Sequence, residues 1–333
     1  MANTGTLGWH STDNVPAQQL YTERVRAVGA FNVMKNDFKG LFARATRKKT
    51  ARVYTTGAEF TKAGEMNSPP VTKQAYDEID LTKPQAYELA AGFTKYAIAE
   101  GVDAEDYRGQ TAQALLAADR VKTKVVLRST MVTGGFWDAT MTTAPHAYKA
   151  YTAPTTSHNH YVASAASGVA TVAIMTTIKD HILEHGYGET GTLVGFMNSD
   201  TAKTIEDKAE WETVANYVGT PFLENLQTRG LWPSTVARPS MEVVGIPMVV
   251  EGWIPQHYIL VVDLGFGDKM CRWRENETGL ETGLVVDTTD DFKQRIEQFR
   301  LWGACNVVHR SAGVAYYLNG GAYVDPTAYD ISA

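Results

Sequence analysis

Two histidines and a glutamate lie within five consecutive residues, His181-Ile182-Leu183-Glu184-His185. On a helix, histidines at i and i+4 share one face and could hold a zinc ion, with the glutamate as general base. This order is the HxxEH pattern of one group of zinc-dependent hydrolases. The pattern fixes only three positions, however, and the sequence identifies no third ligand. Because Ile174 and Ile178 continue the same helical face, we interpret these histidines as packing residues.

A second group of histidines, His158-Asn159-His160 with His146 upstream, lies in a segment predicted to be a loop. It could bind a metal, but no acidic residue or cysteine stands nearby to complete a ligand set. Gly265-Phe266-Gly267 lacks the third glycine of a dinucleotide site, and the sequence contains no GxxxxGKS or GxxxxGKT phosphate loop and no GxSxG elbow. We therefore assign no catalytic, cofactor-binding or metal residue, expect no cofactor, and predict that the protein is not an enzyme.

The composition is that of a folded globular chain of 333 residues, with 44% hydrophobic and 20% charged residues. This length allows roughly two domains of about 100–200 residues. The 31 basic and 37 acidic residues give a net charge of −6, so the whole molecule is not expected to be drawn to nucleic acid or anionic lipid. Only two cysteines, Cys271 and Cys305, are present, which fits a reducing compartment. Without a long apolar run or a signal peptide, we expect neither a membrane span nor secretion.

Positive charge and helical periodicity coincide near the N-terminus. Between residues 24 and 52 the sequence has nine basic residues and a single acidic one, Asp37. Apolar residues recur at helical spacing from Leu20 to Met34, which predicts a basic amphipathic helix. Such a helix packs on its own domain, or it docks on an acidic neighbouring subunit or faces nucleic acid. The sequence leaves these alternatives open.

Residues 49–83 predict two strands around a turn. Alternating patterns over 50–56 and 75–81 flank a segment, 62–70, that contains Gly, Asn, Ser and two Pro residues. Large apolar residues are sparse here, and an isolated two-stranded hairpin is marginally stable in water. We therefore expect the hairpin to lie on another surface, which belongs to a second subunit if the hairpin extends away from its own domain.

A long helix is predicted after a further alternating run from Tyr87 to Phe93. Asp103 suits the N-cap position, Glu105 and Asp106 suit the first turn, and an apolar face continues to Met131. At 1.5 Å per residue, about 27 residues span roughly 40 Å. A helix of this length is long for a compact domain and suits a spine helix, one that supports a domain along its length.

The second half of the chain is richer in strands. A helix is predicted over 169–185, capped by Ser167 and ended by Gly186, and a short buried strand over 193–197 leads into a short helix. The later strand patterns cover residues 243–250, 258–262, 270–273, 284–286, 292–302, 305–309 and 314–318. This order predicts an α+β fold rather than a regular βαβ alternation.

The order of these parts is similar to that of the major capsid protein of tailed phages, the Hong Kong 97-type fold. Residues 103–130 resemble its spine helix and residues 52–82 its extended loop. Gly195-Phe196-Met197-Asn198-Ser199-Asp200 and Val244-Gly245-Ile246-Pro247-Met248-Val249 resemble segments of its axial domain, and residues 258–263 resemble the next strand. Residues 292–318, with Arg300 in their middle, resemble its closing strands. The resemblance covers nearly the whole chain.

The resemblance implies a division into six parts. In chain order they are an N-terminal arm, an extended-loop hairpin, a peripheral domain with the spine helix 103–131, an axial domain, the peripheral-domain strands and a C-terminal segment. Their expected bounds are 1–48, 49–92, 93–167, 168–268, 269–318 and 319–333.

The implied function is structural: self-assembly into hexamers and pentamers that form the icosahedral head of a tailed DNA phage. The implied partners are the chain itself, a separate scaffolding protein, a portal protein and packaged double-stranded DNA in non-specific contact, with no membrane; a decoration protein is left open. The expected location is the virion, after assembly in the host cytoplasm. Because the arm begins at Met1, we expect any scaffold to be a separate protein. No isopeptide cross-link is carried over, since Lys62 and Lys73 have no identifiable Asn partner.

Residues of the arm and hairpin form our predicted assembly interface: Leu20, Val25, Val28, Phe31, Met34, Arg52, Tyr54, Phe60 and Met66. Two other functions stay open. The shell protein of a bacterial encapsulin-type nanocompartment would share the fold and enclose an enzyme cargo. A zinc-dependent hydrolase would instead use His181, Glu184 and His185 with a bound metal.

Overall fold

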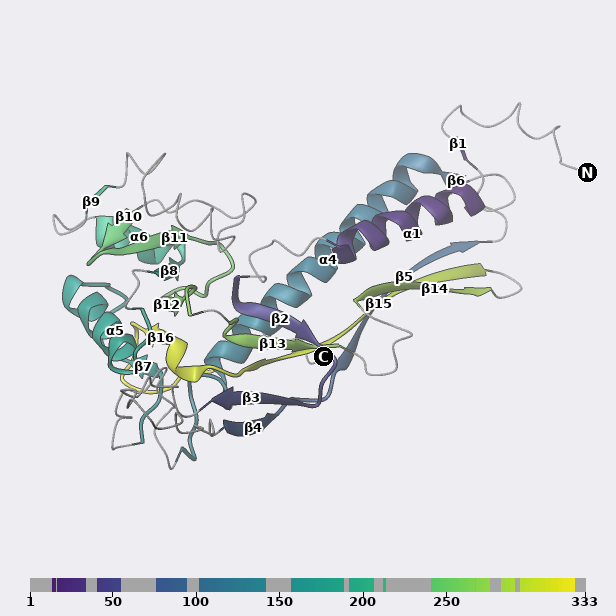
Figure 1. Ribbon diagram of the computed structural model, residues 1–333. Helices are drawn as coiled ribbons and strands as arrows, with labels where there is room; N and C mark the ends of the chain where they lie inside the picture. The colour runs from purple at the N-terminus through teal and green to yellow at the C-terminus, as the bar shows by residue number, and fades with distance from the viewer. Residues whose placement is uncertain are drawn as a thin grey trace, which may run out of the picture. The chain divides into compact units, whose positions relative to one another are not determined.

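Helices and strands make up most of the residues that the computed structural model describes (Figure 1). The structure describes residues 14–15, 17–33, 41–54, 76–94, 102–141, 157–188, 192–206, 212–213, 241–266, 268–275, 283–290 and 294–326. The chain divides into two units: unit 1 is Met1–Lys35, Lys83–Lys122 and Arg274–Ala304, and unit 2 is Asn36–Thr82, Thr123–Trp273 and Cys305–Ala333. No helix in the described ranges is long and apolar enough to cross a membrane.

The described part of unit 1 combines two helices with an antiparallel sheet. Its elements are α1 (Ala17–Val33), the first part of α4 (Ala104–Met131), β1 (Asn14–Val15), β5 (Gln85–Thr94), β6 (Val102–Asp103), β14 (Leu284–Asp290) and most of β15 (Gln294–Val307). Strand β15 pairs with β14 on one side and β5 on the other, and β1 pairs with β6. Helices α1 and α4 lie side by side, where Arg108 pairs with Glu23 at 3.0 Å.

The local sequence explains where helix α4 begins. The Asp103 carboxylate accepts hydrogen bonds from the backbone N–H groups of Glu105 (2.8 Å) and Asp106 (3.2 Å). These bonds satisfy donors that the first helical turn leaves without a partner. The predicted spine helix and its cap are therefore confirmed.

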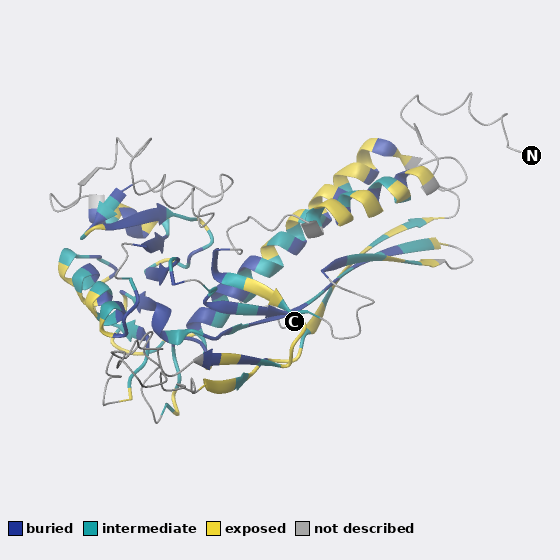
Figure 2. Cartoon of the chain, in the orientation of Figure 1, coloured by how far each residue is buried: buried dark blue, intermediate teal, exposed yellow. Residues whose placement is uncertain are grey.

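The core of unit 1 lies between its helices and its sheet. Val28 from α1 and two alanines from α4 pack with apolar residues of the strands, and the cluster consists of Val28, Ala114, Ala118, Leu284, Phe299 and Leu301. Figure 2 shows exposed residues along both helices in addition to these buried ones. The small alanine side chains allow close packing on the α4 surface.

Unit 2 is built on a seven-stranded sheet with the order β7-β16-β12-β8-β11-β10-β9. These strands are β7 (Tyr161–Ala163), β8 (Leu193–Met197), β9 (Glu212–Thr213), β10 (Met241–Val243), β11 (Ile246–Val250), β12 (Tyr258–Asp263) and β16 (Gly313–Tyr317). Every residue of β8 and β12 is buried, which explains why both are continuous apolar runs. Among the described residues of this unit, helix α5 covers Val172–Glu184 and helix α6 covers Ser199–Glu206, and the last part of α4 also belongs to the unit.

The short helix predicted after the first buried strand is confirmed as α6, where Ala202 and Ile205 are buried. Helix α5 begins later than predicted. Thr171, not Ser167, is its N-cap, and its hydroxyl accepts the backbone N–H of Ile174 at 3.3 Å. Ser167 instead has a positive φ of 55° and lies in a turn with Gly168. The cap prediction was wrong because the turn delays the helix by several residues.

The strand predicted over 243–250 is a hairpin. Strand β10 ends at Val243 and β11 begins at Ile246, and the two pair antiparallel. The two residues between them, Val244 and Gly245, have φ values of 54° and 74°. Two successive positive φ angles make the tight turn that reverses the chain, so a single strand was the wrong prediction.

The predicted hairpin near the N-terminus is confirmed at its base. Strands β3 (Thr50–Tyr54) and β4 (Tyr76–Asp80) pair antiparallel, and residues 55–75 lie outside the described residues. The remaining strands are β2 (Ala43–Thr46) and β13 (Cys271–Arg274), and a short 3-10 helix covers Arg310–Ala312. The two strands predicted over 292–302 and 305–309 form the single strand β15, since Gly303 continues the ladder opposite Gln85.

Candidate functional site

The predicted assembly residues on α1 divide into buried and exposed ones. Leu20 and Val28 are 0% and 5% exposed and belong to the core of unit 1. They are therefore not available to a neighbouring subunit, and their assignment to the interface is corrected. Val25, by contrast, is 44% exposed. Phe31 is half-buried, and the Lys122 ammonium lies 4.6 Å from the centre of its ring.

The remaining predicted assembly residues belong to the hairpin, apart from Met34. Arg52 is exposed, pairs with Glu78 across the two strands at 2.9 Å, and lies over the ring of Tyr76. The side chain of Tyr54, and the residues Met34, Phe60 and Met66, lie outside what the structure describes. The interface role of Val25, Phe31 and Arg52 stays a prediction.

The base of the hairpin packs within unit 2. Ala51 and Val53 of β3 form a small core with Leu81 and Val308, and the backbone N–H of Leu81 donates to the carbonyl of Lys49 at 2.8 Å. At its base, the hairpin therefore packs on a surface of its own chain.

A buried ion pair that sequence reasoning missed fixes α1 in unit 1. Arg24 was counted among the basic residues of the predicted amphipathic helix, whose partner was left open, but it is 1% exposed and donates to Glu297 at 2.6 Å. It also donates to the hydroxyl of Thr111 at 2.8 Å and to the carbonyl of Tyr107 at 3.2 Å. Burial lowers the pKa of Arg24, while Tyr107 and Glu297 oppose that shift. The sequence did contain one indication of this burial: Arg24 is four residues from both Leu20 and Val28, which places it on the same helical face.

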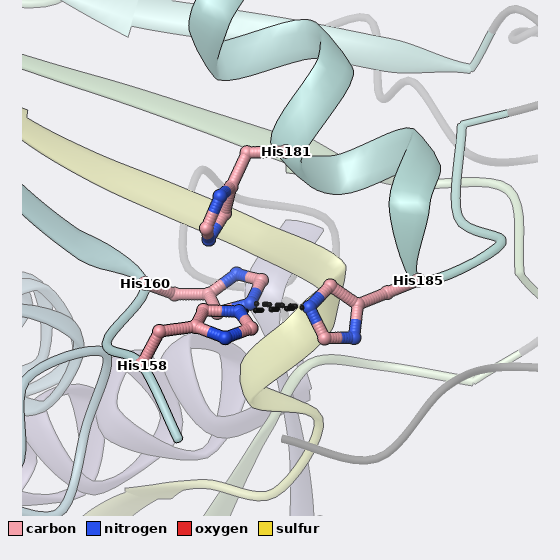
Figure 3. A group of neighbouring side chains, drawn as sticks. All are labelled: His158, His160, His181 and His185. Atoms are coloured by element: carbon pink, nitrogen blue, oxygen red, sulfur yellow. Dashed lines mark hydrogen bonds between the residues drawn. The ribbon is translucent and has the colours of Figure 1, made fainter. Parts of the chain in front are cut away.

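Four histidines from separate segments gather in unit 2. His181 and His185 come from the end of α5, and His158 and His160 come from the segment just before β7 (Figure 3). Their ligand nitrogens all lie within 4.8 Å of one another. The Nε2 atom of His185 is 3.0 Å from that of His158 and 3.1 Å from that of His160.

Burial sets the charge of these histidines. It lowers the pKa of His185 to about 4, and His158 and His181 add to the effect. It also lowers the pKa of His160 and of His181. These three imidazoles are therefore uncharged near neutral pH, the form in which a ring nitrogen can bind a metal ion.

The arrangement differs from the hydrolase pattern that the sequence offered. Glu184 is exposed and is not part of the histidine group. The two histidine motifs, which the sequence presented as separate and incomplete, supply four nitrogens to one place. A catalytic zinc ion usually keeps one position open for water or substrate, whereas four protein ligands would close a tetrahedral site.

No protein-family model matches the chain, and no curated protein matches it. Solved structures do match. A structure from Mycobacterium phage Patience aligns with 97% of this chain and 94% of its own, with a TM-score of 0.60 and 15% identity. The mature capsid of bacteriophage PhiM1 aligns with 85% of this chain and 87% of its own, with a TM-score of 0.51 and 12% identity. The chain has the Hong Kong 97-type fold of tailed-phage capsid proteins.

The Hong Kong 97-type fold confirms the α+β class and the resemblance predicted from the order of the elements. The holo-SrpI encapsulin complex of Synechococcus elongatus is also similar, with 11% identity, a TM-score of 0.47 and 94% coverage of each chain. Within this fold, the histidine group lies in unit 2 and the Arg24–Glu297 pair lies in unit 1.

Proposed function

We propose that the chain is the major subunit of the icosahedral head of a tailed DNA phage and assembles into hexamers and pentamers. The observation that carries this proposal is the likeness of fold over nearly the whole chain to a Mycobacterium phage Patience structure, joined by the PhiM1 mature capsid.

The exposure of two strands supports assembly with other copies. Strands β4 and β5 contain no buried residue, and Leu89 of β5 and Tyr76 of β4 are 46% and 44% exposed. A strand in a folded domain usually buries at least one face against another layer. A neighbouring subunit that covers these strands would bury the faces that the single chain leaves open.

The parts of the fold take corresponding roles in this proposal. Helix α4 is the spine, β3 and β4 form the base of the extended loop, and strands β8 to β12 of the unit 2 sheet belong to the axial domain. Strands β7 and β16 of the same sheet lie outside the bounds 168–268 that the sequence predicted for that domain. The net charge of −6 suits a wall that does not trap densely packed DNA by whole-molecule attraction. The proposed partners are a separate scaffolding protein, a portal protein and the packaged DNA, and assembly takes place in the host cytoplasm.

The test is assembly of the full chain with its scaffolding protein, followed by negative-stain electron microscopy and analysis of the particle contents. We expect closed particles of uniform size that protect double-stranded DNA from nuclease when the packaging proteins are present. A protein cargo in place of DNA would favour a nanocompartment. A stable 36.5 kDa monomer under all assembly conditions would overturn the proposal.

Removal of residues 57–70 tests the role of the hairpin separately. The deletion leaves the described strands β3 and β4 and their small core intact, so we expect normal circular dichroism and no closed shells. A variant in which the same segment is replaced by a Gly-Ser segment of equal length is the matched control for loop length. Loss of folding in both variants would place the segment in the core of the chain instead.

A further inference from the structure

We propose that His158, His160, His181 and His185 form a structural site for a divalent transition-metal ion, with Zn²⁺ as the expected occupant. The ion would fasten the end of helix α5 to the segment that leads into strand β7. This inference does not depend on the proposed function, because it concerns the internal construction of unit 2.

The distances suit a single ion. Imidazole nitrogens lie about 2.0–2.1 Å from zinc, so the nitrogens of a tetrahedral site are about 3.3–3.4 Å apart. The two measured separations between Nε2 atoms are 3.0 and 3.1 Å, and no pair of ligand nitrogens in the group is more than 4.8 Å apart. Two of these separations lie close to the tetrahedral value, and the whole group is compact enough to surround one ion.

A backbone carbonyl orients the ring of His160. The Nδ1 atom of His160 lies 2.9 Å from the carbonyl oxygen of Gly313. Because a carbonyl only accepts, Nδ1 must carry the proton, and the neutral ring then presents the Nε2 lone pair to the group. Metal-binding histidines are commonly held in this way, with the second ring nitrogen donating to a carbonyl or carboxylate.

His181 has a ring nitrogen without a hydrogen-bond partner among the described residues. This nitrogen, the Nε2 atom, is buried. A buried ring nitrogen without a partner is uncommon in folded proteins, and a metal ion in the group would coordinate it.

The ligand type selects the class of ion. All four side chains are imidazoles, and no carboxylate or thiolate belongs to the group within the described part of the chain. Calcium and magnesium prefer oxygen ligands, whereas imidazole suits zinc, copper and nickel. Among these, zinc takes four ligands in a tetrahedral arrangement most readily, as structural sites require.

The ion would join segments that are distant along the chain. His158 and His160 precede β7, which pairs with β16 at the edge of the seven-stranded sheet. His181 and His185 lie in and just after the last turn of α5. Strand β7 has only three residues, so a metal link to α5 would anchor a short edge strand that has few ladder hydrogen bonds of its own.

The test uses the purified full-length protein. Metal content is measured by mass spectrometry, the protein is then stripped with a chelator, and Zn²⁺ or Co²⁺ is added back by titration. We expect one ion per subunit, a higher melting temperature with Zn²⁺, and the intense visible absorption of tetrahedral Co²⁺. Absence of saturable binding by the folded, stripped protein for both ions would overturn the proposal.

Four variants locate the site. His158→Gln and His181→Gln each remove one ligand that is partly exposed, and we expect about tenfold weaker binding or more, with changed Co²⁺ absorption. His257→Asn, outside the group in the same unit, and Glu184→Gln, the glutamate of the hydrolase pattern, should bind as the parent protein does. Unchanged binding in both ligand variants would overturn the proposal. If a ligand variant does not fold, the titration of the parent protein still decides the question.

Discussion

The guanidinium group of Arg24 lies 2.6 Å from the carboxylate of Glu297, and both side chains are almost fully buried. The two residues are 273 positions apart, so this pair joins the N-terminal helix to the sheet of unit 1. Tyr107 donates its hydroxyl to the same oxygen of Glu297, and Arg295 contacts the other oxygen at 3.1 Å. The helix is therefore part of the folded unit rather than a free arm.

Arg24→Met should destabilise the protein by about 3–5 kcal/mol, because the Glu297 carboxylate would be left buried without its main partner. Urea unfolding followed by circular dichroism measures this loss. Arg26→Met is the control, since Arg26 is exposed on the same helix and its replacement should change stability by less than about 0.5 kcal/mol. Equal effects of the two variants would contradict the burial of Arg24.

Variants at Val25 and Val28 distinguish an effect on assembly from an effect on folding. Val25 is 44% exposed and Val28 is 5% exposed, so Val25→Asp should fold normally and reduce the yield of closed shells. Val28→Asp should lower the free energy of unfolding by more than about 3 kcal/mol, because it places an unpaired charge in an apolar core. Unfolding curves and particle counts by electron microscopy give the two measurements. Normal shells from Val25→Asp would remove Val25 from the assembly interface.

The turn between β10 and β11 contains a valine in a conformation that valine disfavours. The φ of Val244 is 54°, and left-handed backbone costs L-residues about 1–2 kcal/mol. Val244→Asn should raise stability by about 1 kcal/mol, since asparagine tolerates this region and suits such turns. Gly245→Ala should lower stability by about 1 kcal/mol for the opposite reason. Thermal unfolding that shows a loss for Val244→Asn would contradict this account.

Asp268 should make the stability of unit 2 depend on pH in the acid range. Burial raises the pKa of Asp268. The hydrogen bond with His309 at 3.2 Å and the charge of Arg272 lower it by a larger amount, so the pKa lies below its usual value. A carboxylate with a lowered pKa in the folded state stabilises the protein above the unfolded pKa of about 4 and loses that contribution as the pH falls.

The matching variant is Asp268→Asn. It should lower the free energy of unfolding by about 1–2 kcal/mol near pH 7, and the difference from the parent protein should shrink as the pH falls below about 4. Denaturant unfolding at a series of pH values provides the measurement. Asp287→Asn, at an exposed position, should show no such dependence. A difference that stayed constant down to the lowest pH would contradict the lowered pKa.

Local signals in the sequence predicted much of the fold. The Asp103 cap, the alternation in β3 and β4, and the continuous apolar runs of β8 and β12 depend on neighbouring residues, and each lies where the pattern indicates. The errors at Ser167 and Val244 share one cause. Both residues have a positive φ, which no preference of serine or valine predicts, so the surrounding structure imposes the turns.

For each of the two candidate sites, the sequence predicted one part and only the tertiary structure completed it. The sequence determined that α1 is amphipathic and that His181 and His185 share a helical face, because helical spacing alone sets both. It did not determine that Arg24 meets Glu297 or that the second pair of histidines meets the first. These contacts join residues that are distant along the chain. Only the packing of helices on sheets brings the histidine nitrogens within 3.0–3.1 Å and the two groups of the ion pair within 2.6 Å of each other.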